Sequence, residues 1–554
     1  MERYVIHRLQ YKANAYLDWN AYQRNFNEYN CKANIVAMEK EELEDKTVSY
    51  QMLQTLKDIT DKEIENLAKR TNEYLSSIGN DFEFQKDAIA KGNKILEEII
   101  NECPELINDD SMRDIIRHYR QDKANNAKCG SLLVDGKYSY LVCDIVPFMY
   151  HLLGCEPKRV LEDGNVSFKE YENDLEMVIE RSPHCYREHG IVKNVVNENT
   201  EKYFVSNCIY CSTDTLLTKL LMYDSDGDVG LAIKQKDFVD IAKRNMGTNF
   251  TGDDKKRIVP LYYKMATASK EPINTTSILY GLTDGWNSNG MKKYSNLFTL
   301  VWNSDISIDE STLDFIKILT MLNNFEIDKA KTNYVPIIPE TIAEKIKGFK
   351  GKSKPYFYRY KKNVNGMKYT NTSESQISCV DKIDAYIKFD NIKAIDESVK
   401  FSGKVLASKT FDSIKLEGTD GKLITAKYEE INKLYHTYFN KDNSNTELVY
   451  KKIRQELKIG EDTDKEICDF LIKSLFVNRS DISKKLLLML YGDQILRNII
   501  KNKSKKKEEM KMECCVCGTE FIAKTNNSKY CSDKCRKAEN LRKTKENKKL
   551  KTKV

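Results

Sequence analysis

The chain has 554 residues, which is enough for three or four domains and a sizeable hydrophobic core. Hydrophobic residues make up 40% and charged residues 31% of the chain, a balance typical of globular proteins and unlike that of disordered ones. We expect no membrane segment, because no apolar run approaches the roughly 20 residues that span a bilayer. The N-terminus shows no export signal. The fifteen cysteines are therefore expected to be thiols and metal ligands in the cytoplasm.

The net charge of +7 is unevenly distributed. Residues 536–554 hold nine Lys or Arg and two Glu, so the remaining residues sum to about zero. This pattern predicts a C-terminal tail that binds phosphates, and it requires any nucleic-acid channel in the body to be a local basic surface. A solvated, solubilising extension is the alternative for the tail.

The first 127 residues predict a mostly helical region. Residues 61–68 combine a helix start with apolar positions three to four apart, and residues 93–102 continue similarly until Pro104. Next, residues 131–134 and 138–143 flank an Asp135-Gly136 turn, a pattern typical of a β-hairpin.

Residues 128–245 predict a small β-barrel with short helices. Strand-like segments are expected at 175–179, 203–205 and 229–233, with a short helix at 214–221. We assign residues 128–245 to a catalytic barrel domain.

The remaining chain predicts three further regions. Residues 246–345 are expected to form a helical scaffold, with the best helical pattern at 311–324. Residues 346–505 begin irregular and Lys-rich, with strand-like pieces such as 404–406, and become helical after about 445. Residues 506–554 hold a cysteine module and the basic tail.

A cluster of carboxylates follows the apolar run 220–223, for which we expect a strand. Asp224, Asp226 and Asp228 alternate around Gly227. Oxygen ligands of this kind suit a hard divalent cation such as Mg²⁺, as a phosphoryl or nucleotidyl transfer site requires. An EF-hand is disfavoured, because its sixth and twelfth positions need Gly and Glu, and the chain has Val and Gln there. An acidic surface turn is the other alternative.

The surroundings of this cluster carry a family resemblance. An Arg-x-Pro segment at Arg181-Ser182-Pro183 precedes the Asp-x-Asp-Gly-Asp cluster, which resembles the largest subunit of cellular RNA polymerases. Downstream, segments 294–296 and 324–332 are similar to single-chain RNA polymerases, namely the RNA-directed enzymes of eukaryotic RNA silencing and their phage and prophage counterparts. The similarity to a phage-type family from Firmicutes genomes covers about nine-tenths of the chain.

This resemblance implies an α+β fold: a double-psi β-barrel catalytic domain flanked by helical domains, with a C-terminal zinc ribbon. It implies Mg²⁺-dependent synthesis of RNA from nucleoside triphosphates on a nucleic-acid template, in the cytoplasm of a bacterial host and with packaging in a virion left open. Asp224, Asp226 and Asp228 would bind Mg²⁺, and Arg181 would meet the ribose of the incoming nucleotide. Arg187 is a further candidate for binding substrate oxygens, since a guanidinium recognises them bidentately.

Several alternatives stay open at this point. The template can be DNA or RNA, and the chain departs from the large-subunit pattern at His184 and Tyr186. A non-catalytic nucleic-acid-binding protein for host takeover and a Mg²⁺-dependent nuclease are the competing functions.

A second barrel bearing lysines accompanies the acidic barrel in this superfamily, and the sequence shows no clear counterpart of it. The chain therefore resembles the back portion of a longer enzyme. We expect a second polypeptide to supply the lysine-bearing barrel, or the chain to be inactive alone.

The C-terminal cysteines predict a zinc site. Cys514, Cys517, Cys531 and Cys535 give the spacing Cys-x₂-Cys-x₁₃-Cys-x₃-Cys, and two close pairs of thiolates suit tetrahedral Zn²⁺. Cys515 is adjacent to Cys514 and could replace it as a ligand. A module of about 30 residues would depend on the metal for most of its stability.

Two weaker patterns favour structural roles. Cys208 and Cys211 form an isolated Cys-x₂-Cys pair and are interpreted as structural thiols. His184 and His189 are interpreted as hydrogen-bonded packing residues, because the chain has only six histidines and no further His cluster.

Overall fold

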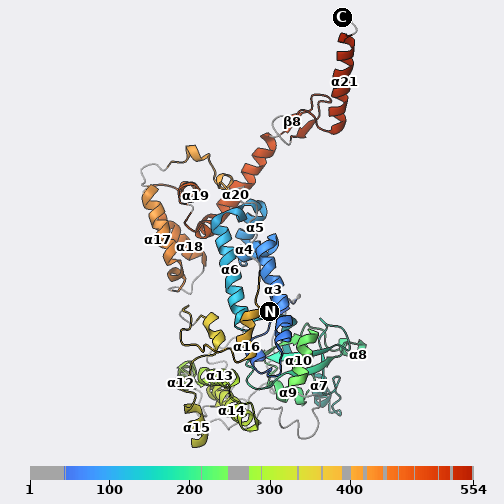
Figure 1. Cartoon of the computed structure of the whole chain (residues 1–554), viewed down its shortest axis with the longest axis vertical. Coiled ribbons are helices and arrows are strands. Elements are labelled where there is room, and N and C mark those ends of the chain that lie inside the picture. The colour runs from blue at the N-terminus through green and yellow to red at the C-terminus, as the bar shows by residue number, and fades with distance from the viewer. Residues whose placement is uncertain are drawn as a thin grey trace. The chain divides into compact units, whose positions relative to one another are not determined.

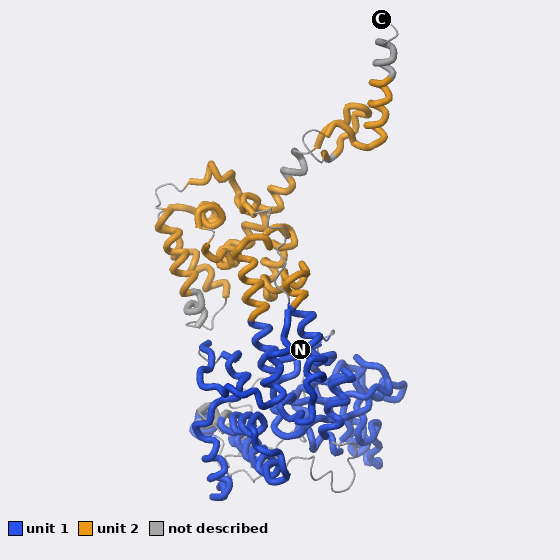
Figure 2. The backbone as a smooth tube through the Cα atoms, viewed as in Figure 1, with its two compact units in different colours: residues 1–75, 122–389 blue, residues 76–121, 390–554 orange. Residues whose placement is uncertain are grey.

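The computed structural model describes residues 43, 45–213, 215–246, 274–287, 290–332, 336–362, 366–389, 401–415, 421–440, 446–459, 461–479, 481–509, 511–523 and 528–551. These form two compact units, coloured separately in Figure 2. Unit 1 comprises residues 1–75 and 122–389, and unit 2 comprises residues 76–121 and 390–554. The helical expectation for residues 1–42 lies outside the described residues.

Unit 1 contains a closed six-stranded β-barrel. Its strands follow the order β2-β6-β3-β5-β4-β7, and β7 pairs back onto β2. The pairs β2–β6 and β3–β5 are parallel and the other pairs of the barrel are antiparallel. A seventh strand, β1, extends the sheet from the start of β2. The bounds are β1 (Asp45–Thr47), β2 (Leu133–Cys143), β3 (Asn165–Ser167), β4 (Glu176–Arg181), β5 (Gly190–Asn194), β6 (Ile209–Cys211) and β7 (Val229–Ile233). The α+β class and the strands expected near 175–179 and 229–233 are confirmed.

The hairpin expected around Asp135-Gly136 is wrong, because β2 is a single strand of 11 residues. Its start pairs with β1, its middle with β7 and its end with β6. Asp-Gly marks a turn only when its two flanks pair with each other, and here the flanks have other partners. Gly136 lies opposite Ile233, where a Cβ would come within 3.1 Å of the Ala232 carbonyl oxygen.

Two further strand expectations in the barrel region are wrong. Residues 203–205 form no strand: Val205 is exposed, while the Phe204 ring stacks on Tyr210 at 4.4 Å between centroids. The apolar run 220–223 begins as the end of helix α9 (Leu216–Leu221) and contains no strand. Leu217 and Leu221 of α9 belong to the barrel core, so the apolar pattern reflects a buried helix face.

Helices complete unit 1 (Figure 1). The predicted helical segment 311–324 lies within α14, which packs on α13 around a second core that includes Trp302, Phe315 and Leu319. The bounds are α2 (Tyr50–Gln54), α7 (Val146–Leu152), α8 (Glu198–Glu201), α10 (Lys236–Met246), α12 (Thr275–Asn287), α13 (Gly290–Trp302), α14 (Glu310–Thr332), α15 (Glu340–Lys347) and α16 (Cys379–Lys382), with 3₁₀ helices η3 (Tyr356–Tyr360) and η4 (Ile383–Tyr386). Helices α3 (Asp61–Asn80) and α6 (Asp110–Lys128) each belong partly to both units.

Unit 2 is mainly helical. Its elements are α4 (Phe82–Ala90), α5 (Lys94–Glu102), η2 (Pro104–Asn108), η5 (Lys404–Leu406), η6 (Phe411–Ser413), α17 (Gly421–Asn440), α18 (Thr446–Leu457), α19 (Asp464–Lys473), the π-helical turn η7 (Ser474–Asn478), α20 (Lys485–Glu509), β8 (Lys511–Glu513), β9 (Glu520–Ile522) and α21 (Asp533–Lys551). The helices expected at 93–102 and after 445 are confirmed. The strand expected at 404–406 is wrong, because Asn498 and Asn502 of α20 bind the carbonyl oxygens of residues 405–407 that a neighbouring strand would otherwise bind.

Candidate active site at the acidic loop of the barrel

The acidic cluster Asp224–Asp228 forms the connection between α9 and β7. Met222 ends α9 in the left-handed conformation (φ 50°), and Gly227 has a φ of 129°, which favours glycine. The Cys143 amide donates to Ser225 Oγ at 3.1 Å, and the Leu141 amide donates to the Asp228 carbonyl at 2.8 Å. The loop is therefore held against the end of β2.

The three carboxylates differ in their surroundings. Asp224 and Asp226 are exposed, whereas Asp228 is half-buried and accepts a hydrogen bond from the Asp224 amide at 2.9 Å. Their carboxylate oxygens do not all lie within 4.8 Å of one another. Carboxylate oxygens are the ligands that Mg²⁺ prefers, and the exposure of Asp224 and Asp226 leaves them accessible to a cation. The donor atoms thus have the chemistry that a hard divalent ion takes, although the three carboxylates do not converge on one point.

Arg181, at the end of β4, lies beside this loop. Its Nη2 forms an ion pair with Asp228 Oδ2 at 2.8 Å, and its Nη1 donates to the Leu221 carbonyl at 3.3 Å. The pairing of β4 with β7 brings them together, since Arg181 lies opposite Gly230. A Cβ on Gly230 would come within 2.8 Å of the Leu141 side chain on β2, so a larger residue here would require that side chain to shift. The fold therefore joins two motifs that stand far apart in the sequence.

Arg187 is placed differently. It lies in the loop 182–189 between β4 and β5, is half-buried, and makes no contact with the acidic loop among the described residues. Its Nε is buried without a hydrogen-bond partner in the same part of the chain. Lys57 is a neighbouring cation: burial, and then the charge of Arg187, lower the Lys57 pKa. The structure thus brings Arg181, but not Arg187, into contact with the aspartates.

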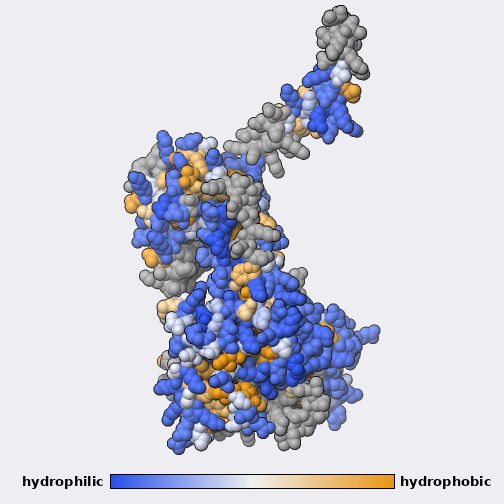
Figure 3. All heavy atoms as spheres, in the orientation of Figure 1, coloured by the Kyte–Doolittle hydropathy of each residue, from blue (hydrophilic) through white to orange (hydrophobic). Residues whose placement is uncertain are grey.

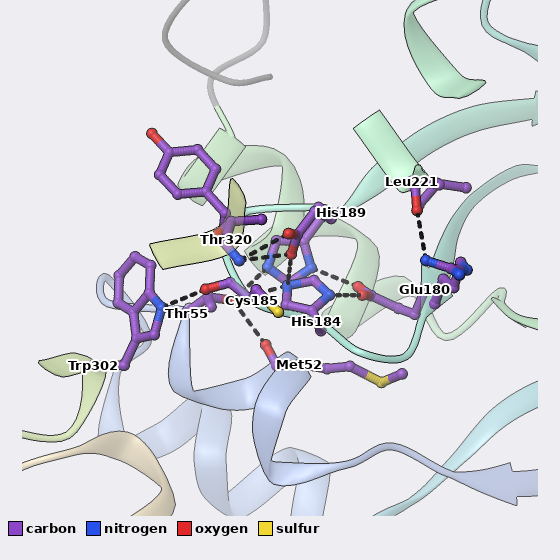
Figure 4. Close-up of polar contacts among 12 residues, drawn as sticks. Met52, Thr55, Glu180, His184, Cys185, His189, Leu221, Trp302 and Thr320 are labelled. Atoms are coloured by element: carbon purple, nitrogen blue, oxygen red, sulfur yellow. Dashed lines mark hydrogen bonds and ion pairs between the residues drawn. The ribbon is translucent and has the colours of Figure 1, made fainter. Parts of the chain in front are cut away.

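A buried polar network anchors the loop 182–189 (Figure 4). Glu180, His184 and His189 are at most 1% exposed. The Glu180 carboxylate lies 3.0 Å from His184 Nδ1 and 2.5 Å from His189 Nδ1. The Thr55 hydroxyl, at the end of α2, lies 3.3 Å from His184 Nε2 and 2.9 Å from His189 Nε2. These contacts agree with the interpretation of both histidines as hydrogen-bonded packing residues.

The same three side chains also have the geometry of a metal-ligating group. The ligand atoms of Glu180, His184 and His189 lie within 4.8 Å of one another. Each of these side chains makes one hydrogen bond or more and is closed off from solvent, but Glu180 Oε2 and His184 Nδ1 have no hydrogen-bond partner among the described residues. These contacts support a structural role, and the same donor atoms could also hold a metal ion.

The pKa values of this network follow from burial and from the charges within it. Burial opposes ionisation of Glu180, but the two histidines outweigh it and hold the pKa of Glu180 below its usual value. Burial likewise opposes the charged form of His184, but Glu180 and Glu188 outweigh it and raise the His184 pKa. Burial raises the Glu188 pKa and lowers the His189 pKa. The network therefore shifts Glu180 and His184 toward their charged forms and His189 toward its neutral form.

Helices α13 and α14 of unit 1 also contact the loop 182–189. Trp302 Nε1, at the end of α13, donates to the Cys185 carbonyl at 2.9 Å, as Figure 4 shows. Cys185 and Tyr186 pack into the core that α13 and α14 share. Asn324 of α14 also contacts Met222 Sδ at 3.4 Å, directly before the acidic loop. Both ends of the site are thus fixed by the helical part of unit 1.

Glu180 and Thr55 were not singled out as site residues by the sequence. Glu180 directly precedes Arg181 and stands four residues before His184, a spacing that could have signalled a contact. No pattern in the sequence connects Thr55 to histidines more than 120 residues away.

The C-terminal cysteines converge. The ligand atoms of Cys514, Cys517, Cys531 and Cys535 lie within 4.8 Å of one another. Sγ of Cys515 instead lies 3.0 Å from the Lys529 carbonyl, which favours Cys514 as the fourth member. A backbone hydrogen bond from Cys531 lowers the pKa of Cys514 to about 6, whereas hydrogen bonds with Cys517 and Cys535 raise the pKa of Cys531 to about 12. This group could hold Zn²⁺.

The second cysteine pair has no such geometry. Cys211 lies fully buried in β6, and burial raises its pKa to about 12. Cys208 is half-buried. Neither belongs to a metal-ligating cluster among the described residues, in keeping with structural thiols.

Comparison with known proteins identifies relatives of the chain. No family model matches it. The DNA-directed RNA polymerase YonO of Bacillus phage SPbeta is 34% identical to it over 557 residues, which cover 98% of this chain and 63% of YonO. The chain is homologous to a phage RNA polymerase. The resemblance to phage-type polymerases is therefore confirmed, and the chain spans less than two thirds of the length of this relative.

A solved structure shows a weaker likeness. The RNA-dependent RNA polymerase QDE-1 from Thielavia terrestris matches with a TM-score of 0.46 and 12% sequence identity, covering 86% of this chain and 59% of QDE-1. Separately, none of the helices in the described part of the chain is long and apolar enough to cross a membrane.

Proposed function

We propose that this chain carries the catalytic site for RNA synthesis on a DNA template, transferring nucleotidyl groups from nucleoside triphosphates. The observation that carries the proposal is the 34% identity to YonO, a DNA-directed RNA polymerase, over 98% of the chain. The contact between Arg181 and Asp228 supports it, because it places a cation beside the carboxylates of one loop.

The side chains of the site have separate proposed roles. Asp224, Asp226 and Asp228 would hold Mg²⁺, which supplies activation of the attacking hydroxyl and neutralisation of the triphosphate. Arg181 keeps donors beyond those bound to Asp228 and Leu221, and these would orient the ribose of the incoming nucleotide. Arg187 would bind substrate oxygens through its guanidinium.

The finer architecture also belongs to this proposal. We assign a double-psi barrel to the catalytic domain 128–245, a scaffold to 246–345, and a mixed, then helical domain to 346–505. Residues 506–554 would form a zinc ribbon with its basic tail, bound to Zn²⁺ through Cys514, Cys517, Cys531 and Cys535 and gripping nucleic acid without reading sequence. The site of action would be the cytoplasm of a bacterial host.

A second polypeptide is a proposed partner. The closed barrel of the described residues carries the acidic loop, and lysines that contact phosphates would come from a separate barrel. Positive groups placed at a developing charge contribute several kcal/mol to catalysis. Activity would therefore rise when the product of the neighbouring upstream reading frame is added.

The proposal is tested by incorporation of labelled ribonucleotides on single-stranded DNA and RNA templates of matched sequence. The chain is assayed alone and with the upstream gene product, with Mg²⁺ or with a chelator. We expect Mg²⁺-dependent RNA on the DNA template, identified by its sensitivity to ribonuclease. Degradation of the template without incorporation would instead favour a nuclease, and template binding without either reaction would favour a non-catalytic protein.

A further inference from the structure

One segment of unit 1 concentrates positive charge. Residues 345–368 contain nine Lys or Arg and no Asp or Glu. The body of the chain is close to neutral once the C-terminal tail is set aside. We call residues 345–368 the basic segment. The proposed metal site at the acidic loop gives no reason for this local excess of positive charge.

Four lysines of the basic segment have no carboxylate partner in the described part of the chain. Lys347, Lys350, Lys352 and Lys368 are all exposed and form no ion pair there. Figure 3 shows hydrophilic and hydrophobic residues side by side at the end of unit 1 around α15. A cation without a neighbouring carboxylate is available to an anionic ligand.

The backbone also places like charges opposite each other. Lys362 and Lys368 form an antiparallel bridge pair. Like charges directly opposite on paired strands are destabilising. Lys362 lies 3.3 Å from Asp122, but Lys368 has no such partner among the described residues. A polyanion bound across this bridge would relieve the repulsion.

Aromatic residues fix the basic segment on unit 1. The Phe349 ring stacks on Phe315 of α14 at 6.2 Å between centroids, and Phe357 is fully buried. The hydroxyls of Tyr356 and Tyr360 both donate to Asp384, at 3.0 and 2.6 Å. These contacts fix the backbone of the basic segment on unit 1, and its exposed lysines extend from that fixed backbone.

Helix α14 connects the basic segment to the acidic loop. Phe315 contacts the segment, and Asn324, nine residues further along α14, contacts Met222 before the acidic loop. Nine residues of helix span about 14 Å. That length corresponds to about four phosphates of one strand of a duplex.

We infer that the basic segment binds the sugar–phosphate backbone of nucleic acid a few nucleotides from the acidic loop. The identity of that nucleic acid as template or product rests on the proposed function. Recognition would be electrostatic and independent of sequence, since exposed lysines contact phosphates as point charges.

The test is the salt dependence of binding, measured by fluorescence anisotropy with a labelled DNA duplex and the full-length protein. In one variant, Lys347, Lys350, Lys352 and Lys368 are all changed to Gln. The matched control changes four other exposed lysines of unit 1 to Gln, namely Lys69, Lys158, Lys202 and Lys388. Circular dichroism melting confirms that both variants fold like the wild type.

Each phosphate contact contributes about 0.9 to the slope of log affinity against log salt. We expect the slope to become shallower by about 3.6 in the basic-segment variant and to stay within about 1 of wild type in the control. Equal slopes for the two variants would overturn the inference. Because the assay needs no catalysis, a reduced slope in a protein that makes no RNA would count against the proposed function alone.

Discussion

Replacing Glu180 with Gln should strongly destabilise unit 1. Glu180 is completely buried and lies 2.5 and 3.0 Å from two histidine nitrogens. The amide keeps the shape but removes the charge that compensates the His184 imidazolium. Breaking a buried ion pair on one side costs about 3–5 kcal/mol. For a unit of more than 300 residues, with an unfolding entropy of about 2.1 cal/mol/K per residue, that lowers the melting temperature by about 4–7 °C.

The effect should depend on pH in a defined window. The lowered pKa of Glu180 means that its contribution is present above the ordinary value of 4.5 and is lost as the pH falls through the folded-state pKa. The raised pKa of His184 means that its contribution is present below 6.5 and is lost as the pH rises through the folded-state pKa. The difference between wild type and variant should therefore be greatest between pH 4.5 and 6.5.

The assay is thermal unfolding followed by circular dichroism across this pH range. Glu176→Gln is the control, because Glu176 lies on the same strand, is 52% exposed and pairs with Lys243 at the surface. Surface pairs contribute about 0–1 kcal/mol. The reasoning is refuted if Glu180→Gln unfolds like Glu176→Gln, or if its deficit is the same at pH 5.5 and pH 9.

Three further outcomes are expected. Asp226→Ala should abolish ribonucleotide incorporation while the melting temperature holds or rises slightly, because an exposed like charge is removed; near wild-type synthesis would exclude the loop as the metal site. Changing Cys531 and Cys535 together to Ser should lower the zinc content measured by atomic emission and leave the main melting transition in place, whereas unchanged zinc would exclude the cluster. Deleting residues 512–554 should weaken binding to all DNA sequences alike and flatten its salt dependence, and unchanged affinity would make the tail only a solubiliser.

The sequence predicted correctly those helices and strands that depend on residues within the segment itself. The helix at 93–102 has a capping residue, Asn93, whose side chain accepts from the Leu96 amide. The strand at 229–233 was likewise predicted with its observed bounds. In both cases the segment's own burial pattern determines its conformation.

The errors came from partners distant in the sequence. β2 continues through Asp135-Gly136 because β1 and β7 pair with either side of it. Residues 404–406 form a 3₁₀ helix because asparagines of α20, about 95 residues away, bind the carbonyls around them. No local pattern encodes such contacts.

The candidate site shows the same division. The sequence motifs predicted Arg181 and the three aspartates as site residues, and the structure shows Arg181 in an ion pair with Asp228. The catalytic roles of these residues stay predictions. The spacing could not show whether Cys514 or Cys515 belongs to the group of four cysteines. The contact of Cys515 with the Lys529 carbonyl favours Cys514. Thr55 was missed because its partners lie on another element of unit 1.

The central claim is that the loop Asp224–Asp228 holds the divalent ion for nucleotidyl transfer. The most direct measurement is cleavage by Fe²⁺ substituted for Mg²⁺. Bound Fe²⁺ reduces added hydrogen peroxide to hydroxyl radicals that cut the backbone nearby, ascorbate returns the Fe³⁺ formed to Fe²⁺, and mass spectrometry locates the cuts. We predict cuts at the loop and close to Arg181 that Mg²⁺ suppresses and that Asp226→Ala removes. Cuts confined to other parts of the chain, or unchanged by Asp226→Ala, would contradict the claim.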